Sequence, residues 1–209
     1  MTNTIKKLDL KKEYKDLFNA DHKSPAIITA PKLNYLTLRG KGDPNTSSEY
    51  QQSIDTLFSV SYKLKFAIKK GQKAIDYGVL PLEGLWWVEN MADFDMKDKS
   101  NWLWQTMILQ PDFVSQEEVD DAIEQVKKKK ALPQLEQLNF EQIEEGLCVQ
   151  ILHIGPYEDE GPTIERLHTF MKDNGYTFNG HHHEIYLSDP RRSAPEKLKT
   201  IIRQPVRKR

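Results

Sequence analysis

Apolar residues recur along the chain with two periods, and their order predicts the secondary structure. Residues 33–39 alternate between two faces, as in a half-buried strand, whereas residues 47–70 carry apolar side chains at three- and four-residue spacing, as in an amphipathic helix. The pattern then predicts two strands and a second helix, over residues 82–89, 102–109 and 115–131. The first part of the chain therefore has the order strand, helix, strand, strand, helix.

The same order returns in the last third of the chain. Residues 147–154 are an apolar run that predicts a strand, and a helical pattern follows over residues 162–173. Two more strands are expected over residues 182–188 and 198–204. A repeated order of elements indicates two similar structural units. The predicted fold class is α+β, in which tandem strand–helix–strand–strand units form a concave antiparallel sheet surface with the helices on its outer face.

The repeat also predicts the domain organisation. One domain is expected over residues 31–206, and residues 1–30 are expected to be an N-terminal extension with one short helix. The two repeats span residues 33–110 and 146–206, and the helix at 115–131 joins them. Since a helix covers only one face of each sheet, the uncovered faces are expected to form a shared cleft. Such a surface needs a ligand, a partner or bulky side chains of its own.

Polar pairs mark where the two helices in the first part of the chain begin. Thr46 and Glu49 have the spacing of a capping box, in which each side chain accepts a hydrogen bond from the other residue's backbone N–H. Ser115 and Glu118 have the same spacing. Both pairs support the predicted helix starts.

Composition narrows the class of protein without identifying it. The chain has 209 residues, of which 38% are hydrophobic, and its formal net charge of −1 is typical of a globular protein and does not favour a nucleic-acid binder. The N-terminus lacks the apolar run of a secretory signal, no stretch is long enough to cross a bilayer, and the single cysteine, Cys148, cannot form an internal disulfide. We therefore expect a cytoplasmic monomer or weak homodimer without nucleic-acid or membrane partners.

The strand predicted over residues 182–188 carries the most informative side chains. Because strand side chains alternate between faces, Glu184 and Tyr186 point one way and Ile185 points the other. A carboxylate inside an apolar cleft could take a proton from water or hold a ligand cation. His182 shares the face of Glu184 and is expected to support it. The alternative is that Glu184 is an ordinary glutamate of an exposed strand.

All four tryptophans lie on two neighbouring predicted strands. Trp86 and Trp87 are adjacent and face opposite ways, whereas Trp102 and Trp104 share one face. Tryptophans more often belong to a core, but Trp86, Trp87 and Trp104 are candidates for an indole wall on which a planar ligand stacks or over which a cation sits. Aligning the repeats favours Trp87, which it places opposite Tyr186. A shift of one residue exchanges Trp87 for Trp86.

Three tyrosines are candidates for the same cleft. Tyr157 follows a Gly-Pro pair at a strand-to-helix turn, Tyr186 shares the face of Glu184, and Tyr35 lies in the first repeat. A phenol placed there could donate a hydrogen bond to a developing oxyanion. The alternative for Tyr157 and Tyr35 is an ordinary packed tyrosine.

The histidine run and the cysteine suggest other chemistry. His181 and His183 share a strand face, and His153 would be the third ligand of a metal site, but no ligand signature supports such a site. Cys148 lies in an apolar strand without a partner that would activate it as a nucleophile. Neither a metal nor another cofactor is expected.

Three segments together resemble the GyrI-like small-molecule-binding superfamily, which also includes the effector-binding domains of multidrug-responsive and AraC-type regulators. These segments are Ile154-Gly155-Pro156-Tyr157, Glu184-Ile185-Tyr186-Leu187-Ser188-Asp189 and Ile201-Ile202-Arg203-Gln204-Pro205-Val206. The resemblance covers residues 33–206 and implies the fold described above, with a ligand cleft between the repeats and the Glu184 carboxylate in it. Some stand-alone members are cyclopropanoid hydrolases, which open the strained ring of DNA-alkylating natural products, and others only bind drugs.

The resemblance has one clear departure from the regulator members. Residues 1–30 are too short and irregular to form a helix-turn-helix module ahead of the sheet, which disfavours a role in gene regulation. The expected function is therefore the hydrolysis of a bulky aromatic cyclopropanoid, with Glu184 activating water and Tyr157 supporting the developing charge. Sequestration of an aromatic drug or cation without turnover is the alternative, and inhibition of a partner enzyme through the acidic rim is a weaker third hypothesis.

Overall fold

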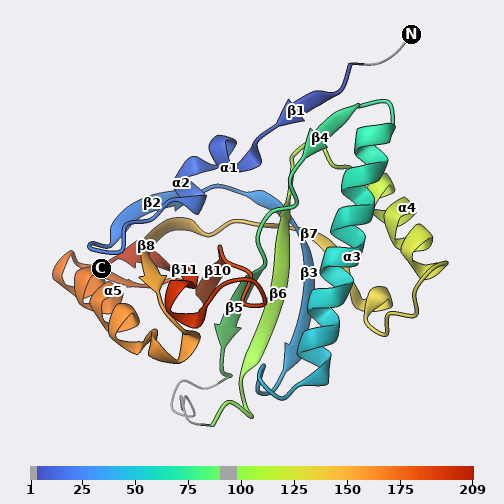
Figure 1. Ribbon diagram of the computed structural model, residues 1–209. Coiled ribbons are helices and arrows are strands. Elements are labelled where there is room, and N and C mark those ends of the chain that lie inside the picture. Colours follow the sequence, from blue (N-terminus) through green and yellow to red (C-terminus); the bar gives the residue numbers. More distant parts are fainter. Residues whose placement is uncertain (1–3, 90–97) are drawn as a thin grey trace. The chain divides into compact units, whose positions relative to one another are not determined.

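The computed structural model describes residues 4–89 and 98–209 (Figure 1). It is a mixed α/β structure whose larger sheets are antiparallel, which confirms the α+β class. The chain forms two compact units, each assembled from separate segments. Unit 1 consists of Met1–Glu13, Leu33–Leu80 and Val88–Ile143, and unit 2 of Tyr14–Lys32, Pro81–Trp87 and Glu144–Arg209.

Unit 1 has an antiparallel sheet in the order β6–β3–β7, a parallel strand pair β1–β4, and the two longest helices of the unit, α3 and α4, packed on each other (Figure 1). Its elements are β1 (Lys6–Leu8), α1 (Leu10–Glu13), β3 (Leu33–Lys41), α3 (Ser48–Lys70), β4 (Ile75–Tyr77), β6 (Leu103–Gln110), α4 (Gln116–Lys127) and β7 (Asn139–Ile143), with a 3-10 turn at Leu135–Gln137.

The helix starts follow the predicted polar pairs closely. At α4 both hydrogen bonds of the capping box between Ser115 and Glu118 are present, as predicted. At α3 the cap is Ser47, whose Oγ accepts from the N–H of Tyr50 at 3.2 Å, so the prediction of Thr46 as the cap was wrong by one residue. Successive Thr and Ser residues offer equivalent hydroxyls, and the local chain path decides which of them caps.

Helix α3 covers one face of the unit 1 sheet. Thr106 on β6 donates to Ser53 of α3 at 2.9 Å, and the Trp104 ring meets Tyr50 edge-on, with centroids 5.2 Å apart. Trp104 pairs with Gly40 on β3, and its indole lies over the glycine, which has no side chain to block it. The core of unit 1 therefore depends on a close approach of an indole to bare backbone.

Gly40→Ala is expected to lower the free energy of unfolding by about 1–3 kcal/mol, because a methyl group at this position would overlap the buried Trp104 ring. Urea unfolding followed by tryptophan fluorescence measures the change. Gly78→Ala is the control, since a Cβ there meets nothing within 4 Å. Equal stabilities of the two variants would contradict the argument.

Unit 2 has an antiparallel sheet in the order β2–β8–β11–β10–β5, and β9 pairs with the end of β11. Its elements are α2 (Lys15–Phe18), β2 (Ala26–Ala30), β5 (Glu83–Trp87), β8 (Gly146–Ile154), α5 (Gly161–Asp173), β9 (Tyr176–Phe178), β10 (His182–Tyr186) and β11 (Lys199–Lys208), with 3-10 turns at Tyr157–Asp159 and Pro195–Lys197.

Helix α5 packs on one face of the unit 2 sheet (Figure 1). Leu167 and Met171 of α5 share a buried apolar cluster with Val149, Ile151 and Ile202 of the sheet. On the other face, Arg203 reaches the backbone of the short helix α2. Unit 2 therefore has covering elements on both faces, whereas the sequence pattern predicted a helix on only one.

The units do not coincide with contiguous stretches of the chain. The segment at 82–89 was expected to belong to the first repeat, but β5 pairs with β10 and lies in unit 2. Residues 14–30, expected to be part of an extension, supply β2 to the edge of the same sheet. Pairing between distant strands decides this grouping, and a local pattern does not encode it.

Candidate functional site

Strand β10, which lies between β11 and β5, places Glu184 on the face of the unit 2 sheet that α5 covers. Glu184 is paired with Ile202 on β11 and with Gly84 on β5. Directly paired residues of antiparallel strands point to the same face, and Ile202 packs with α5. His168 of α5 supports this placement, because burial and, second, the proximity of His182 lower its pKa. The expectation that the carboxylate lies on a face free of helices was therefore wrong for unit 2.

The Glu184 carboxylate is fixed by two neighbours on its own strand. The Tyr186 hydroxyl donates to Oε2 at 2.7 Å, and Nε2 of His182 lies 3.1 Å from Oε1. The side chain of Glu184 is only 13% exposed. The arrangement is a partly desolvated acceptor whose orientation is set by hydrogen bonding.

Tyr157 lies beside this carboxylate at the turn before α5. Its ring meets the Tyr186 ring edge-on, with centroids 5.6 Å apart, and 36% of the residue is exposed. Burial, followed by the nearby carboxylates of Glu160, Glu184 and Asp189, raises the pKa of Tyr157 to about 12. The phenol therefore keeps its proton at neutral pH and can act as a hydrogen-bond donor.

The register of β5 decides which indole shares the Glu184 face. Trp86 is paired with His182 and is on that face. Trp87 points to the other face, where its ring stacks on His181 with centroids 4.4 Å apart. The preference for Trp87 over Trp86 was therefore wrong, because a shift of one residue exchanges the two faces of a strand.

Tyr35 and Trp104 belong to unit 1. Trp104 is fully buried against helix α3. Tyr35 is also buried, and it lies on the opposite face of its sheet, because it pairs with Leu109 rather than with the residues that face α3. Their part in ligand binding stays a prediction, as does a cleft shared by the two repeats.

A buried ionic network lies on the reverse face of β10, and the sequence did not reveal it. Nε2 of His183 is 2.9 Å from Glu83 and Nδ1 is 2.9 Å from Glu145, while Arg203 donates to Glu145 at 3.2 Å. Because both imidazole nitrogens face carboxylate oxygens, both must donate, so His183 is an imidazolium. The available signal was that His183 shares a strand face with Ile185 and Arg203 shares one with Ile201, and on a buried apolar face a charge requires a partner.

The pKa values of the network agree with this geometry. Burial by itself would lower the pKa of His183, but the two carboxylates raise it to about 9. Burial would likewise raise the pKa of Glu145, but His183 and Arg203 lower it to about 2. Two cations and two carboxylates therefore balance their charges inside unit 2.

The residues weighed as metal ligands or as a nucleophile make other contacts. His153 lies within hydrogen-bond distance of Thr163 and of the Pro156 carbonyl. His181 stacks on Trp87, and His183 is paired with two carboxylates. Burial raises the pKa of the Cys148 thiol to about 12, so the reactive thiolate is scarce at neutral pH. Among residues 4–89 and 98–209, no group of three metal-ligating side chains comes together.

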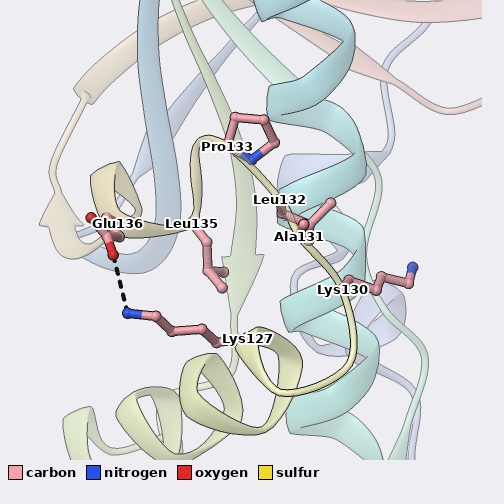
Figure 2. Close-up of a pocket in the computed structure, with 7 residues that line it drawn as sticks. All are labelled: Lys127, Lys130, Ala131, Leu132, Pro133, Leu135 and Glu136. Atoms are coloured by element: carbon pink, nitrogen blue, oxygen red, sulfur yellow. Dashed lines mark hydrogen bonds and ion pairs between the residues drawn. The ribbon is translucent and has the colours of Figure 1, made fainter.

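A separate surface pocket of about 240 Å³ lies after helix α4 in unit 1 (Figure 2). Leu132, Pro133 and Leu135 line it. Lys127 and Glu136, also in the lining, form an ion pair at 3.0 Å, which is the dashed line in Figure 2. None of the predicted site residues is in its lining. Besides the pair of Lys127 and Glu136, the lining includes Lys130, whose ammonium group donates to the Ser59 hydroxyl at 3.1 Å.

Comparison of this chain with known proteins and solved structures shows which protein family it belongs to. The model of the GyrI-like small molecule binding domain matches residues 23–207. The chain is similar to an uncharacterized conserved protein from Listeria innocua (40% identity, 96% of this chain and 100% of that chain covered, TM-score 0.88) and to a hydrolase from the same organism (39% identity, 97% and 100% covered, TM-score 0.86). The C-terminal domain of EcmrR, at 17% identity and TM-score 0.53 over 89% of this chain and 98% of that chain, shares the fold.

No curated protein matches the chain. In the part of the chain that the structure describes, no helix has the length and apolar character needed to span a membrane. The match over most of the sequence establishes that the chain belongs to the GyrI-like family of small-molecule-binding domains.

Proposed function

We propose that this protein is a cofactor-independent hydrolase that opens the cyclopropane ring of a bulky aromatic electrophile, with Glu184 as the general base. The observation that carries the proposal is the Glu184 carboxylate, oriented by Tyr186 and His182 and flanked by Tyr157. The similarity over nearly the whole chain to proteins described as hydrolases, at 37% and 39% identity, supports hydrolysis as the reaction type.

The aromatic side chains around Glu184 favour a flat substrate. Trp86, Tyr157 and Tyr186 all belong to unit 2 and lie on the carboxylate's face or at the turn beside it. Aromatic side chains stack on planar ligands at little entropic cost. A suitable substrate is a cyclopropane conjugated to a cyclohexadienone carbonyl, because relief of ring strain lowers the barrier and the carbonyl accepts the electrons.

The reaction balances without a cofactor. Glu184 takes a proton from water while the water oxygen bonds to the cyclopropane methylene. The carbon–carbon bond between this methylene and the ring breaks, and its electron pair moves into the dienone to form a phenolate. Tyr157, which is protonated at neutral pH, donates to this developing oxyanion. The proton on Glu184 then passes to the phenolate, and the net change is the addition of one water.

A binding-only function is the second candidate, and one observation favours it. Three carboxylates, those of Glu160, Glu184 and Asp189, surround the Tyr157 phenol closely enough to raise its pKa. Negative charge beside aromatic rings suits an aromatic cation, which would be held without turnover.

A spirocyclopropyl cyclohexadienone in isotopically labelled water tests the proposal. The wild-type protein is expected to produce, over many turnovers, an adduct of one labelled water, detected by mass spectrometry. Glu184→Gln keeps the size of the side chain but removes the base, and is expected to slow turnover at least about a hundredfold while the probe still binds.

Glu165→Gln on the exposed side of α5 is the matched control and is expected to retain full turnover. Stoichiometric binding with recovery of unchanged probe would eliminate the hydrolase and leave the binding function. Equal turnover by Glu184→Gln and Glu165→Gln would eliminate Glu184 as the base.

A further inference from the structure

Gly84 on β5 lies directly opposite Glu184 and on the same face of the sheet. An ideal Cβ at this position would be 2.9 Å from Nε1 of Trp86 and 3.2 Å from the hydroxyl of Tyr186. Real Cβ atoms essentially never approach as closely as the first distance. The indole and the phenol therefore occupy the space that a side chain of residue 84 would fill.

Backbone conformation does not explain this glycine. Gly84 is within a regular strand, paired on one side with β10, and its φ is outside the left-handed region that favours glycine. Glycine in the interior of a strand weakens the strand, and it often marks a place where another group approaches the backbone closely. The close approach here is that of two side chains that share the face of Glu184.

We propose that Gly84 is a positioning residue of the Glu184 site, a role that rests on the proposed function. It provides the space in which the Trp86 indole lies back along β5 and the Tyr186 hydroxyl reaches Glu184 at 2.7 Å. A methyl group at residue 84 displaces the indole and moves the phenol away from the carboxylate. Gly84 thus determines how closely an indole, a phenol and the reactive carboxylate come together.

Gly84→Ala is the test variant, and Gly161→Ala is its control in the same unit. A Cβ at Gly161 meets nothing within 4 Å, and its φ is also outside the left-handed region. The first readout is the indole N–H resonance of Trp86 in a ¹H–¹⁵N spectrum, identified by its loss in Trp86→Phe. Gly84→Ala is expected to shift this resonance strongly, and Gly161→Ala to leave it in place.

The second readout is turnover of the spirocyclopropyl cyclohexadienone. A hydrogen bond to a charged group is worth about 1.5–3 kcal/mol, so weakening the Tyr186 contact is expected to lower kcat/KM about ten- to hundredfold. A general loss of stability would not produce this fall at a temperature where both variants are fully folded by circular dichroism. Gly161→Ala is expected to retain the wild-type kcat/KM.

The double variant Gly84→Ala/Trp86→Phe tests whether Gly84 acts by leaving space for the Trp86 indole. Phenylalanine at residue 86 removes the ring edge that carries Nε1, so adding Gly84→Ala to Trp86→Phe is expected to cost much less than adding it to the wild type. If Gly84→Ala alone does not fold, the double variant is still expected to fold, because phenylalanine at residue 86 relieves the overlap with the new methyl group. An unchanged Trp86 resonance, or an equal loss in both backgrounds, would overturn the proposal.

The two proposals fail in different ways. The indole resonance requires no substrate, so it tests Gly84 even if the wild-type protein does not turn over the probe. Absence of turnover together with a shifted resonance would refute the hydrolase and leave the positioning role of Gly84 for a bound ligand. Turnover that is unaffected by Gly84→Ala would refute the positioning role alone.

Discussion

Arg203→Met is expected to lower the free energy of unfolding by about 3–5 kcal/mol, the typical effect of breaking a buried ion pair by removing one partner. Arg203 is 1% exposed and donates to Glu145 at 3.2 Å and to the Gln150 side chain at 3.0 and 3.1 Å. It also donates to the Leu17 carbonyl at 2.6 Å, which ties α2 to the sheet. Methionine fills much of the same volume but leaves a buried carboxylate and a buried carbonyl without these donors.

Chemical denaturation at neutral pH measures this effect, and Arg207→Met is the matched control. Arg207 is an exposed residue of the same strand, where loss of the charge is expected to change stability by less than about 0.5 kcal/mol. If the two variants lost equal stability, the network would contribute no more than a surface charge.

The second large expected effect is a change of stability with pH, with one decline at high pH and another at low pH. The pKa of His183 is raised from 6.5 to about 9, so its stabilisation is fully present below pH 6.5 and is lost as the pH rises towards 9. The pKa of Glu145 is lowered from 4.5 to about 2, so its contribution is present above pH 4.5 and is lost as the pH falls towards 2. We therefore expect maximum stability between about pH 4.5 and 6.5 from these two groups.

The expected change is about 3 kcal/mol for each decline, because each pKa difference corresponds to roughly that free energy. Denaturant titrations at a series of pH values measure it. His183→Gln cannot become charged and is expected to remove most of the decline between pH 6.5 and 9. A wild-type stability that stayed constant over that interval would show that His183 is not held as an imidazolium.

Local sequence patterns predicted the longer elements because they depend on contacts along the chain. The three- and four-residue spacing in 47–70 became α3, and the apolar run at 147–154 became β8. The strands β1, β4 and β9 have only three residues each, too few to show an alternation. Their pairing partners lie elsewhere in the chain, so local periodicity does not reveal them.

In the candidate site, too, local alternation predicted some features and pairing between distant strands decided the others. Alternation along β10 correctly placed Glu184, Tyr186 and His182 on one face, and the structure joins them by hydrogen bonds. The choice between Trp86 and Trp87 depended on the register between β5 and β10, which is set by strand pairing across the sheet. The sequence therefore indicated that an indole was available but could not decide which one shares the carboxylate's face.

His183 shows most clearly what only tertiary structure decides. The run His181-His182-His183 suggested metal ligands, yet the three side chains have three different environments: a stack on Trp87, a contact with Glu184, and a fully buried ion pair. By itself the sequence determined the α+β class, the main helices and strands, and the shared face of Glu184 and Tyr186, because alternation and helical spacing are local properties. Strand register, the burial of the ionic network and the space over Gly84 arise from segments far apart in the chain, and only folding brings these segments into contact.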